Sequence, residues 1–168
     1  MRMTGDQKTV AIGAASGLAT MIVAVWLLQL VLPRPATANP LDYAVSWNAF
    51  AALPLFFTLA AIGNARFKSE AIDPTLGKDS PKMIIDGRVA DNTLQQFALF
   101  AVATLALAVN LPPERLNVVG AAAIVFVAMR LAFWAGYRIR PVYRAFGFAG
   151  TAYLNLALLA AALWLAIA

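Results

Sequence analysis

The chain has 168 residues, of which 62% are hydrophobic and 12% are charged, and its mean hydropathy is +0.75. A soluble domain carries about a quarter charged residues, so this composition excludes an ordinary soluble globular protein. The chain has no Cys and no His, which excludes disulfides, thiolate or imidazole metal sites, and catalysis by a Cys or His side chain. In so apolar a chain, we interpret the net charge of +5 as basic residues placed on one side of a membrane, not as a nucleic-acid-binding surface. We therefore expect a lipid bilayer as partner and no nucleic acid.

Five apolar segments follow one another along the chain and predict five transmembrane helices. They are residues 10–32, 43–65, 97–109, 116–137 and 145–168. A bilayer core needs about 20 apolar residues of helix. The third segment is short, and it reaches that length if its helix begins near Arg88 or Asn92.

The connections between these segments contain the residues that end helices. Prolines at positions 33, 35 and 40 separate the first two segments, and Pro112 with Pro113 makes a tight turn after the third. We expect a long polar loop over residues 66–91, broken by prolines and glycines, and a short link over residues 138–144.

The basic residues lie mostly on one side of the predicted membrane. With the N-terminus inside, ten fall on the inner side: Arg2, Lys8, Arg66, Lys68, Lys78, Lys82, Arg88, Arg138, Arg140 and Arg144. Only Arg34 and Arg115 fall outside, and Arg130 lies within a span. This positive-inside bias predicts an N-terminus inside and a C-terminus outside.

The first segment has a second interpretation, as a signal peptide with a small-residue cleavage site at residues 36–38. Its apolar stretch is longer than the 7–15 residues that are typical of such a peptide. We therefore favour a retained helix.

Polar residues share a helix face in two places near the inner side. Arg88, Asn92, Gln95 and Gln96 have the spacing i, i+4, i+7 and i+8, and Arg130, Phe133, Trp134 and Tyr137 have i, i+3, i+4 and i+7. An Arg within a span costs several kcal/mol unless it is paired or reaches water, so Arg130 is a functional candidate, with snorkelling as the alternative. The alternative for Gln95 and Gln96 is hydrogen bonding between helices.

A pocket of this composition favours a small anionic ligand, because Arg binds carboxylates through two parallel hydrogen bonds. Without His, Cys or a carboxylate in mid-membrane, the chain offers no good general base near pH 7. Catalysis would therefore use electrostatics or a nucleophile that the ligand carries.

Two separated motifs resemble those of a known family. Residues 88–97 resemble the helix start R-x-x-x-N-x-x-E, and residues 130–137 resemble R-x-x-Y/H-x-x-G/A-Y, followed downstream by Arg144, Gly147 and Phe148. Together they are similar to the MAPEG family, the membrane-associated proteins in eicosanoid and glutathione metabolism, over residues 46–168.

The resemblance implies an all-α integral membrane fold and a homotrimer. Residues 41–168 would form the family's four-helix transmembrane bundle, and residues 1–40 would add an N-terminal helix and linker. Glutathione would bind between neighbouring subunits, near the cytoplasmic side. No metal is implied.

The resemblance also implies roles for individual residues. Arg144 would be catalytic by stabilising the glutathione thiolate, since a nearby Arg lowers the pKa of a thiol. The binding residues would be Arg88, Asn92, Gln95, Gln96, Arg130, Tyr137 and Arg66. Two positions depart from the family pattern: Gln95 replaces a Glu that holds the amino group of the ligand, and Phe133 replaces a Tyr or His.

These observations predict a membrane-bound glutathione-dependent transferase or peroxidase that acts on lipophilic electrophiles. The alternative is a non-catalytic MAPEG-like scaffold or accessory subunit of a larger membrane complex, which the two departures and the additional helix favour. A small transporter is a third hypothesis, which would need polar residues along the whole depth of a pore. The high Ala content favours a bacterial cytoplasmic (inner) membrane.

Overall fold

The structure, a computed structural model, describes residues 3–35 and 39–168, and within them five helical segments are long and apolar enough to cross a membrane. The predicted five spans are thereby confirmed. The spans are α1 (Gly5–Val31), α2 (Pro40–Ala51) continued by α3 (Leu53–Phe67), α4 (Pro81–Asn110), α5 (Asn117–Ile139) and α6 (Ala145–Ile167). Short 3-10 turns lie between them: η1 (Glu70–Ile72), η2 (Pro74–Leu76), η3 (Pro113–Arg115) and η4 (Pro141–Arg144).

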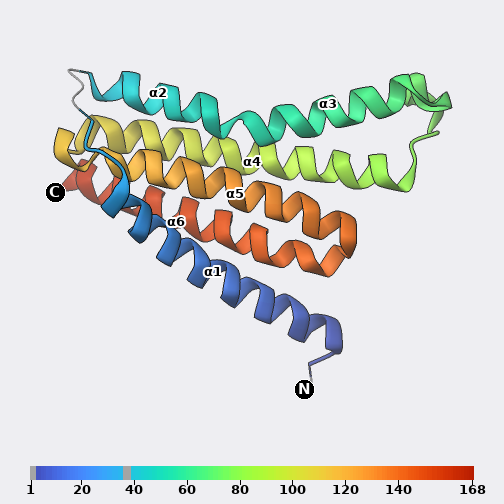
Figure 1. Ribbon diagram of the computed structural model, residues 1–168, viewed down its shortest axis with the longest axis horizontal. Helices are drawn as coiled ribbons and strands as arrows, with labels where there is room; N and C mark the ends of the chain where they lie inside the picture. Colours follow the sequence, from blue (N-terminus) through green and yellow to red (C-terminus); the bar gives the residue numbers. More distant parts are fainter. Residues whose placement is uncertain (1–2, 36–38) are drawn as a thin grey trace.

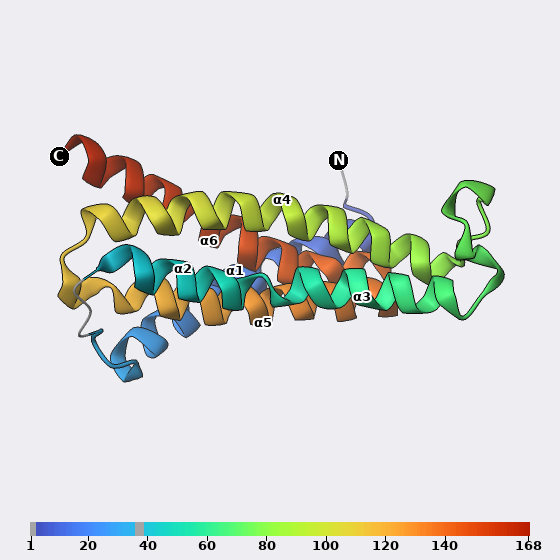
Figure 2. The same ribbon diagram turned by 90° about the horizontal axis from the view of Figure 1, so that it is seen from above.

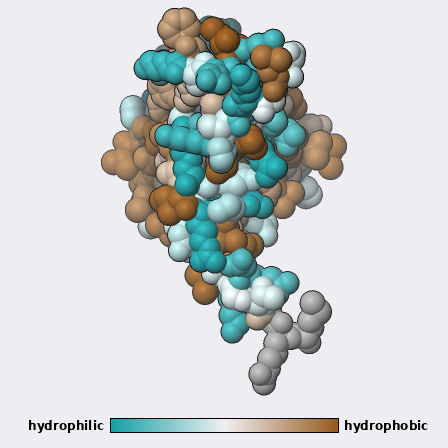
Figure 3. Space-filling model, turned by 90° about the vertical axis from the view of Figure 1, so that its right-hand side faces the viewer, coloured by the Kyte–Doolittle hydropathy of each residue, from teal (hydrophilic) through white to brown (hydrophobic). Residues whose placement is uncertain are grey.

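Successive spans run in opposite directions (Figure 1). The α2–α3 span packs on α4 and α5, α6 packs against α4 and α5 from the other side, and α1 crosses the outer face of α6 (Figures 1 and 2). We call the end at which α1 begins, α3 ends and α5 turns into α6 the basic end. Seen from this end, hydrophilic side chains gather between apolar flanks (Figure 3).

The third span begins earlier than the sequence predicted, so the expected loop over residues 66–91 is wrong. The connection covers residues 68–80, because α4 starts at Pro81. The side chain of Ser80 accepts a hydrogen bond from the backbone nitrogen of Met83 at 3.3 Å, and a proline suits the first helical turn because it needs no amide donor there. Asp86 therefore lies inside a helix.

A proline divides the second span without ending it. Pro54 falls in the first turn of α3, where a missing amide hydrogen breaks the ladder of the preceding helix. Ala52 between the two helices keeps helical backbone angles, with φ −74° and ψ −17°. As a result α2 and α3 form one span with an interruption.

The N-terminal helix packs closely on the rest of the bundle. Gly13 and Gly17 are spaced as in the small-residue motif of membrane helix pairs. A Cβ atom on Gly17 would lie 2.1 Å from the carbonyl oxygen of Phe146, so only glycine allows this approach of α1 to α6. The possible cleavage site at 36–38 lies outside the described residues, and the domain boundary at residue 40 stays a prediction.

Candidate functional site

A cavity of about 480 Å³ lies at the basic end, between five elements of the chain. Its lining comes from α1, α4, α5, η4 and α6: Val10, Arg88, Asn92, Phe133, Tyr137, Val142, Arg144, Ala145 and Phe148. Its size is typical of a small-molecule site. The lining includes two arginines and no acidic side chain, so the cavity suits an anionic ligand. Of the predicted site residues, it brings together Arg88, Asn92, Tyr137 and Arg144.

Helix α4 contributes Arg88 and Asn92, which lie one turn apart on its face toward the cavity. Arg88 is exposed and forms no ion pair within the described part of the chain. Its guanidinium therefore keeps its hydrogen-bond donors for a ligand. Asn92 is half-buried, and its side-chain oxygen is occupied by Arg130.

The turn after α5 brings Arg144 over Tyr137. Helix α5 ends at Ile139, and Pro141 starts the 3-10 turn η4, as expected for a proline that cannot continue a helix. The guanidinium carbon of Arg144 lies 4.9 Å from the centre of the Tyr137 ring, and its Nη1 donates to the carbonyl oxygen of Pro141 at 2.9 Å. These two contacts orient Arg144 and leave most of its donors available.

The apolar wall of the cavity depends on a close approach of α5 and α6 at Gly147. A Cβ atom at this position would lie 2.4 Å from the backbone nitrogen of Phe133. The rings of Phe133 and Phe148 consequently lie 6.4 Å apart and both line the cavity. Phe133 also meets the ring of Tyr137 edge to face at 5.8 Å.

Arg130 lies behind this wall and does not line the cavity. It is 1% exposed, and its guanidinium carbon lies 4.0 Å from the centre of the Phe133 ring. It donates to the hydroxyl of Thr93 from Nε (3.2 Å) and Nη2 (2.9 Å), to that of Thr151 (3.2 Å) and to the side-chain oxygen of Asn92 (3.0 Å). The snorkelling alternative requires contact with water and is therefore wrong. Arg130 reaches the site through Asn92, whose amide it orients.

The adjacent glutamines point in different directions. Gln96 is buried, and the side-chain nitrogen of Asn155 donates to its side-chain and backbone oxygens, both at 2.9 Å. This confirms the interhelical hydrogen bond that the sequence left open. Gln95 is exposed and lines no wall of the basic-end cavity.

Arg66, the remaining predicted site residue, lies at the end of α3 and forms a bidentate pair with Asp79 at 3.1 and 2.8 Å. The hydrogen bonds from Arg66 lower the pKa of the Asp79 carboxyl. Arg66 does not line the cavity.

One polar cluster near the cavity was missed by the sequence analysis. Asp86 is 2% exposed and accepts hydrogen bonds at 2.7 Å from Nε1 of Trp134 and at 2.7 Å from Nε of Arg138. Arg138 also stacks on Trp134, with its guanidinium carbon 4.6 Å from the ring centre. The i, i+4 spacing of Trp134 and Arg138 is visible in the sequence, but Asp86 falls in the expected loop over residues 66–91.

Comparison with known proteins identifies the family. The family model of MAPEG matches residues 44–164, from within α2 to near the end of α6. The match includes each residue that lines the cavity except Val10 and leaves α1 outside. Searches of curated proteins and of solved structures found no match. Because the family model covers most of the chain and five helices can span a membrane, this integral membrane protein belongs to the MAPEG family.

Proposed function

We propose that this protein is a membrane-bound glutathione-dependent transferase or peroxidase that acts on lipophilic electrophiles. One observation carries the proposal: Arg88, Asn92, Tyr137 and Arg144 converge on one cavity without an acidic side chain. The two arginines come from separate elements, α4 and η4, so only the folded chain brings them together.

The donors in the cavity fit the anionic groups of glutathione, which carries two carboxylates, an ammonium group and a thiol. The guanidinium of Arg88 is free to bind a carboxylate through two parallel hydrogen bonds, and the side-chain nitrogen of Asn92 is free to donate a further one. The ammonium group finds no carboxylate in the lining. Gln95 stands at the family position for that contact and offers a neutral amide instead.

The role of Arg144 follows from its charge and its surroundings. Glutathione supplies a thiol, whose thiolate form is the nucleophile. A guanidinium beside a thiol lowers the thiol pKa from its usual value of about 8.5, which increases the thiolate fraction at pH 7. Arg144 lies at the exposed rim of the cavity, beside the apolar side chains of Phe133, Val142 and Phe148. A lipophilic electrophile would arrive from the bilayer.

The proposal extends to assembly and location. We propose a homotrimer in a bacterial cytoplasmic (inner) membrane, with the N-terminus inside. The exposed side chain of Gln95 supports the trimer, because it would join the ligand site only from a neighbouring subunit. The basic residues at the basic end support the orientation, since cytoplasmic loops carry an excess of Lys and Arg.

The decisive experiment is ultraviolet difference absorbance of the purified protein with saturating glutathione. We expect a thiolate band in the wild type, its loss in Arg144→Ala and partial retention in Arg144→Lys. Arg140→Ala is the matched control, because Arg140 lies on the same turn but pairs with Asp6 at 2.7 Å and lines no wall of this cavity. If neither binding by calorimetry nor a thiolate band is found at millimolar glutathione, the enzyme proposal fails and the non-catalytic scaffold takes its place.

A further inference from the structure

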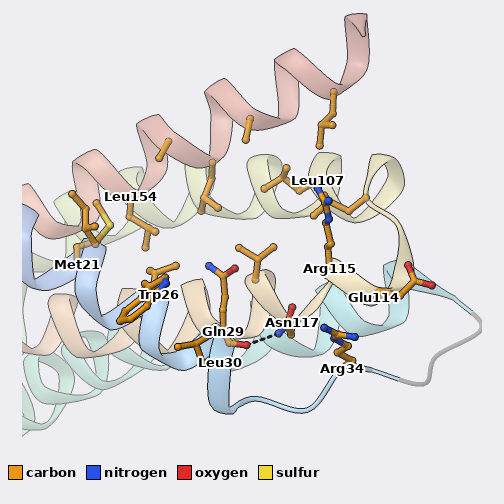
Figure 4. A pocket seen from close by; sticks show the side chains of 18 residues that line it. Met21, Trp26, Gln29, Leu30, Arg34, Leu107, Glu114, Arg115, Asn117 and Leu154 are labelled. Carbon is orange, nitrogen blue, oxygen red and sulfur yellow. Dashed lines mark hydrogen bonds between the residues drawn. The ribbon is translucent and has the colours of Figure 1, made fainter.

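A second pocket, of about 750 Å³, lies at the end of the bundle opposite the basic end. It is formed by the second half of α1, the second half of α6 and the turn between α4 and α5. Apolar side chains such as Met21, Leu154 and Leu158 form its inner part. Arg34, Glu114 and Arg115 gather at the other end of the pocket (Figure 4).

We call the end of the pocket that holds Arg34, Glu114 and Arg115 its mouth. The two arginines at this mouth are unusual for their side of the membrane. Arg34 and Arg115 are the two basic residues that the charge bias places outside, and they come from the α1–α2 linker and from η3. The positive-inside rule explains an excess of Lys and Arg on the inner side, but it does not require basic residues on the outer side. Both nevertheless line one pocket, and neither has an ion pair within residues 3–35 and 39–168. With Glu114 as the acidic residue of the lining, the mouth has an excess of positive charge.

The α1 helix is fixed where it forms the wall of this pocket. The side-chain nitrogen of Asn117 on α5 donates to the backbone oxygen of Gln29 at 2.9 Å. The side chain of Gln29 extends into the pocket (Figure 4). It adds a polar group between the charged mouth and the apolar interior.

We propose that this pocket binds a membrane phospholipid with an anionic headgroup. The phosphate would lie between Arg34 and Arg115, since a guanidinium matches phosphate oxygens bidentately. An acyl chain would follow the apolar wall between α1 and α6 toward Met21 and Leu154. The gradient from charged mouth to apolar interior matches a phospholipid, whereas a small hydrophilic anion would leave the apolar part without a partner. Van der Waals packing of the acyl chain against these side chains then adds to the headgroup contacts.

Native mass spectrometry of the purified full-length protein tests the proposal. Phosphatidylglycerol and phosphatidylcholine are offered in equal amounts, and we expect retention of phosphatidylglycerol in preference. The double variant Arg34→Gln/Arg115→Gln should lower the phosphatidylglycerol adduct at least fivefold and abolish the preference. Lys68→Gln, which also removes an exposed charge but at the basic end, should leave the preference unchanged.

A second variant tests the acyl-chain part of the pocket. Ala161→Trp places a large ring in the lining of α6 and should lower retention of both lipids, whereas the matched control Ala160→Trp, an exposed residue outside the lining, should not. The proposal is overturned if the double arginine variant keeps the wild-type preference. It is also overturned if Ala161→Trp changes the oligomer mass but not lipid retention, which would make a second copy of the chain the occupant. Neither outcome bears on glutathione binding at the other end.

Discussion

The cavity at the basic end and the pocket at the opposite end each present two arginines, but the side chains around them differ. In the basic-end cavity, Arg88 and Arg144 stand beside an amide and a phenol, with no acidic residue in the lining. In the opposite pocket, Arg34 and Arg115 stand at the mouth of an apolar groove. The number of cations is therefore a poor guide to the ligand, and the groups behind them distinguish a small polar anion from an amphiphile.

The two ends differ in the same way below the surface. Behind the basic-end cavity, Arg130 and Asp86 are buried within charge-assisted hydrogen bonds. Toward the opposite end, buried polar contacts join neutral groups, such as Asn48 with Thr104 at 3.0 Å and Asn117 with Gln29. Charge-assisted hydrogen bonds are about twice as strong as neutral ones, so we expect the basic end to tolerate polar substitutions least.

Replacing Asp86 by Leu should have the largest effect. The substitution leaves Arg138 and the indole N–H of Trp134 without their acceptor. Removing one partner of a buried pair costs about 3–5 kcal/mol, and because Arg138 stays partly exposed we expect about 3 kcal/mol. Asn117→Leu at the opposite end, which removes one neutral hydrogen bond, should cost about 1 kcal/mol. Denaturant unfolding in detergent measures both, and equal losses would contradict the difference between the two ends.

Replacing Thr93 by Val should have the next largest effect. The hydroxyl of Thr93 accepts from Nε and Nη2 of Arg130, and hydrogen bonds to charged groups contribute about 1.5–3 kcal/mol. Thr58→Val is a matched control, since Thr58 is equally buried but its hydroxyl donates only to carbonyls of its own helix. We expect the control to cost less than about 1 kcal/mol.

The Thr93 variant also tests the link between Arg130 and the cavity. If Arg130 orients Asn92, Thr93→Val should weaken glutathione binding in calorimetry, whereas Thr58→Val should not. Unchanged affinity in a destabilised Thr93 variant would limit Arg130 to a structural role.

The sequence predicted the five spans because an apolar stretch of sufficient length has few alternatives in a membrane. The start of α4 was not predicted, because residues 81–91 carry charges that are typical of a loop. Their helical conformation depends on the local cap at Ser80 and on burial of Asp86 against Trp134 and Arg138. Only the contacts of Asp86 are long-range, and the sequence does not reveal them.

The candidate site could be predicted only in part, because it too depends on contacts between distant parts of the chain. Helical spacing and the resemblance selected Arg88, Asn92, Tyr137 and Arg144, which the structure brings to one cavity. Spacing does not reveal which part of a wide polar face meets a cavity and which meets another helix. The hydrogen bond of Asn155 to Gln96 and the contacts of Arg130 with two threonines required the packed bundle.

A smaller effect is expected from restoring the family's charge at position 95. Gln95→Glu offers a carboxylate to the ammonium group of glutathione, and one charge-assisted hydrogen bond in place of a neutral one adds about 1 kcal/mol, or about fivefold in affinity. Retention of phosphatidylglycerol at the opposite end should not change. Titration calorimetry decides the point, and weaker binding in Gln95→Glu would mean that this side chain faces an anionic group of the ligand.

The smallest effect is expected where the end of α3 meets the following loop, at the partly exposed pair of Arg66 and Asp79, whose side chains are 33% and 25% exposed. Arg66 lowers the folded-state pKa of Asp79 below its usual value of 3.8. The pair therefore stabilises the fold fully above the unfolded-state pKa, and this contribution disappears as the pH falls through the lower folded-state pKa. The difference in thermal stability between the wild type and Asp79→Asn should stay constant from pH 7 to pH 5 and shrink only as the pH falls below the usual carboxyl pKa of 3.8. Solvent screens an exposed pair, so this difference should be far smaller than that of Asp86→Leu; a comparable loss would show that the basic end depends on its surface charges as much as on its buried ones.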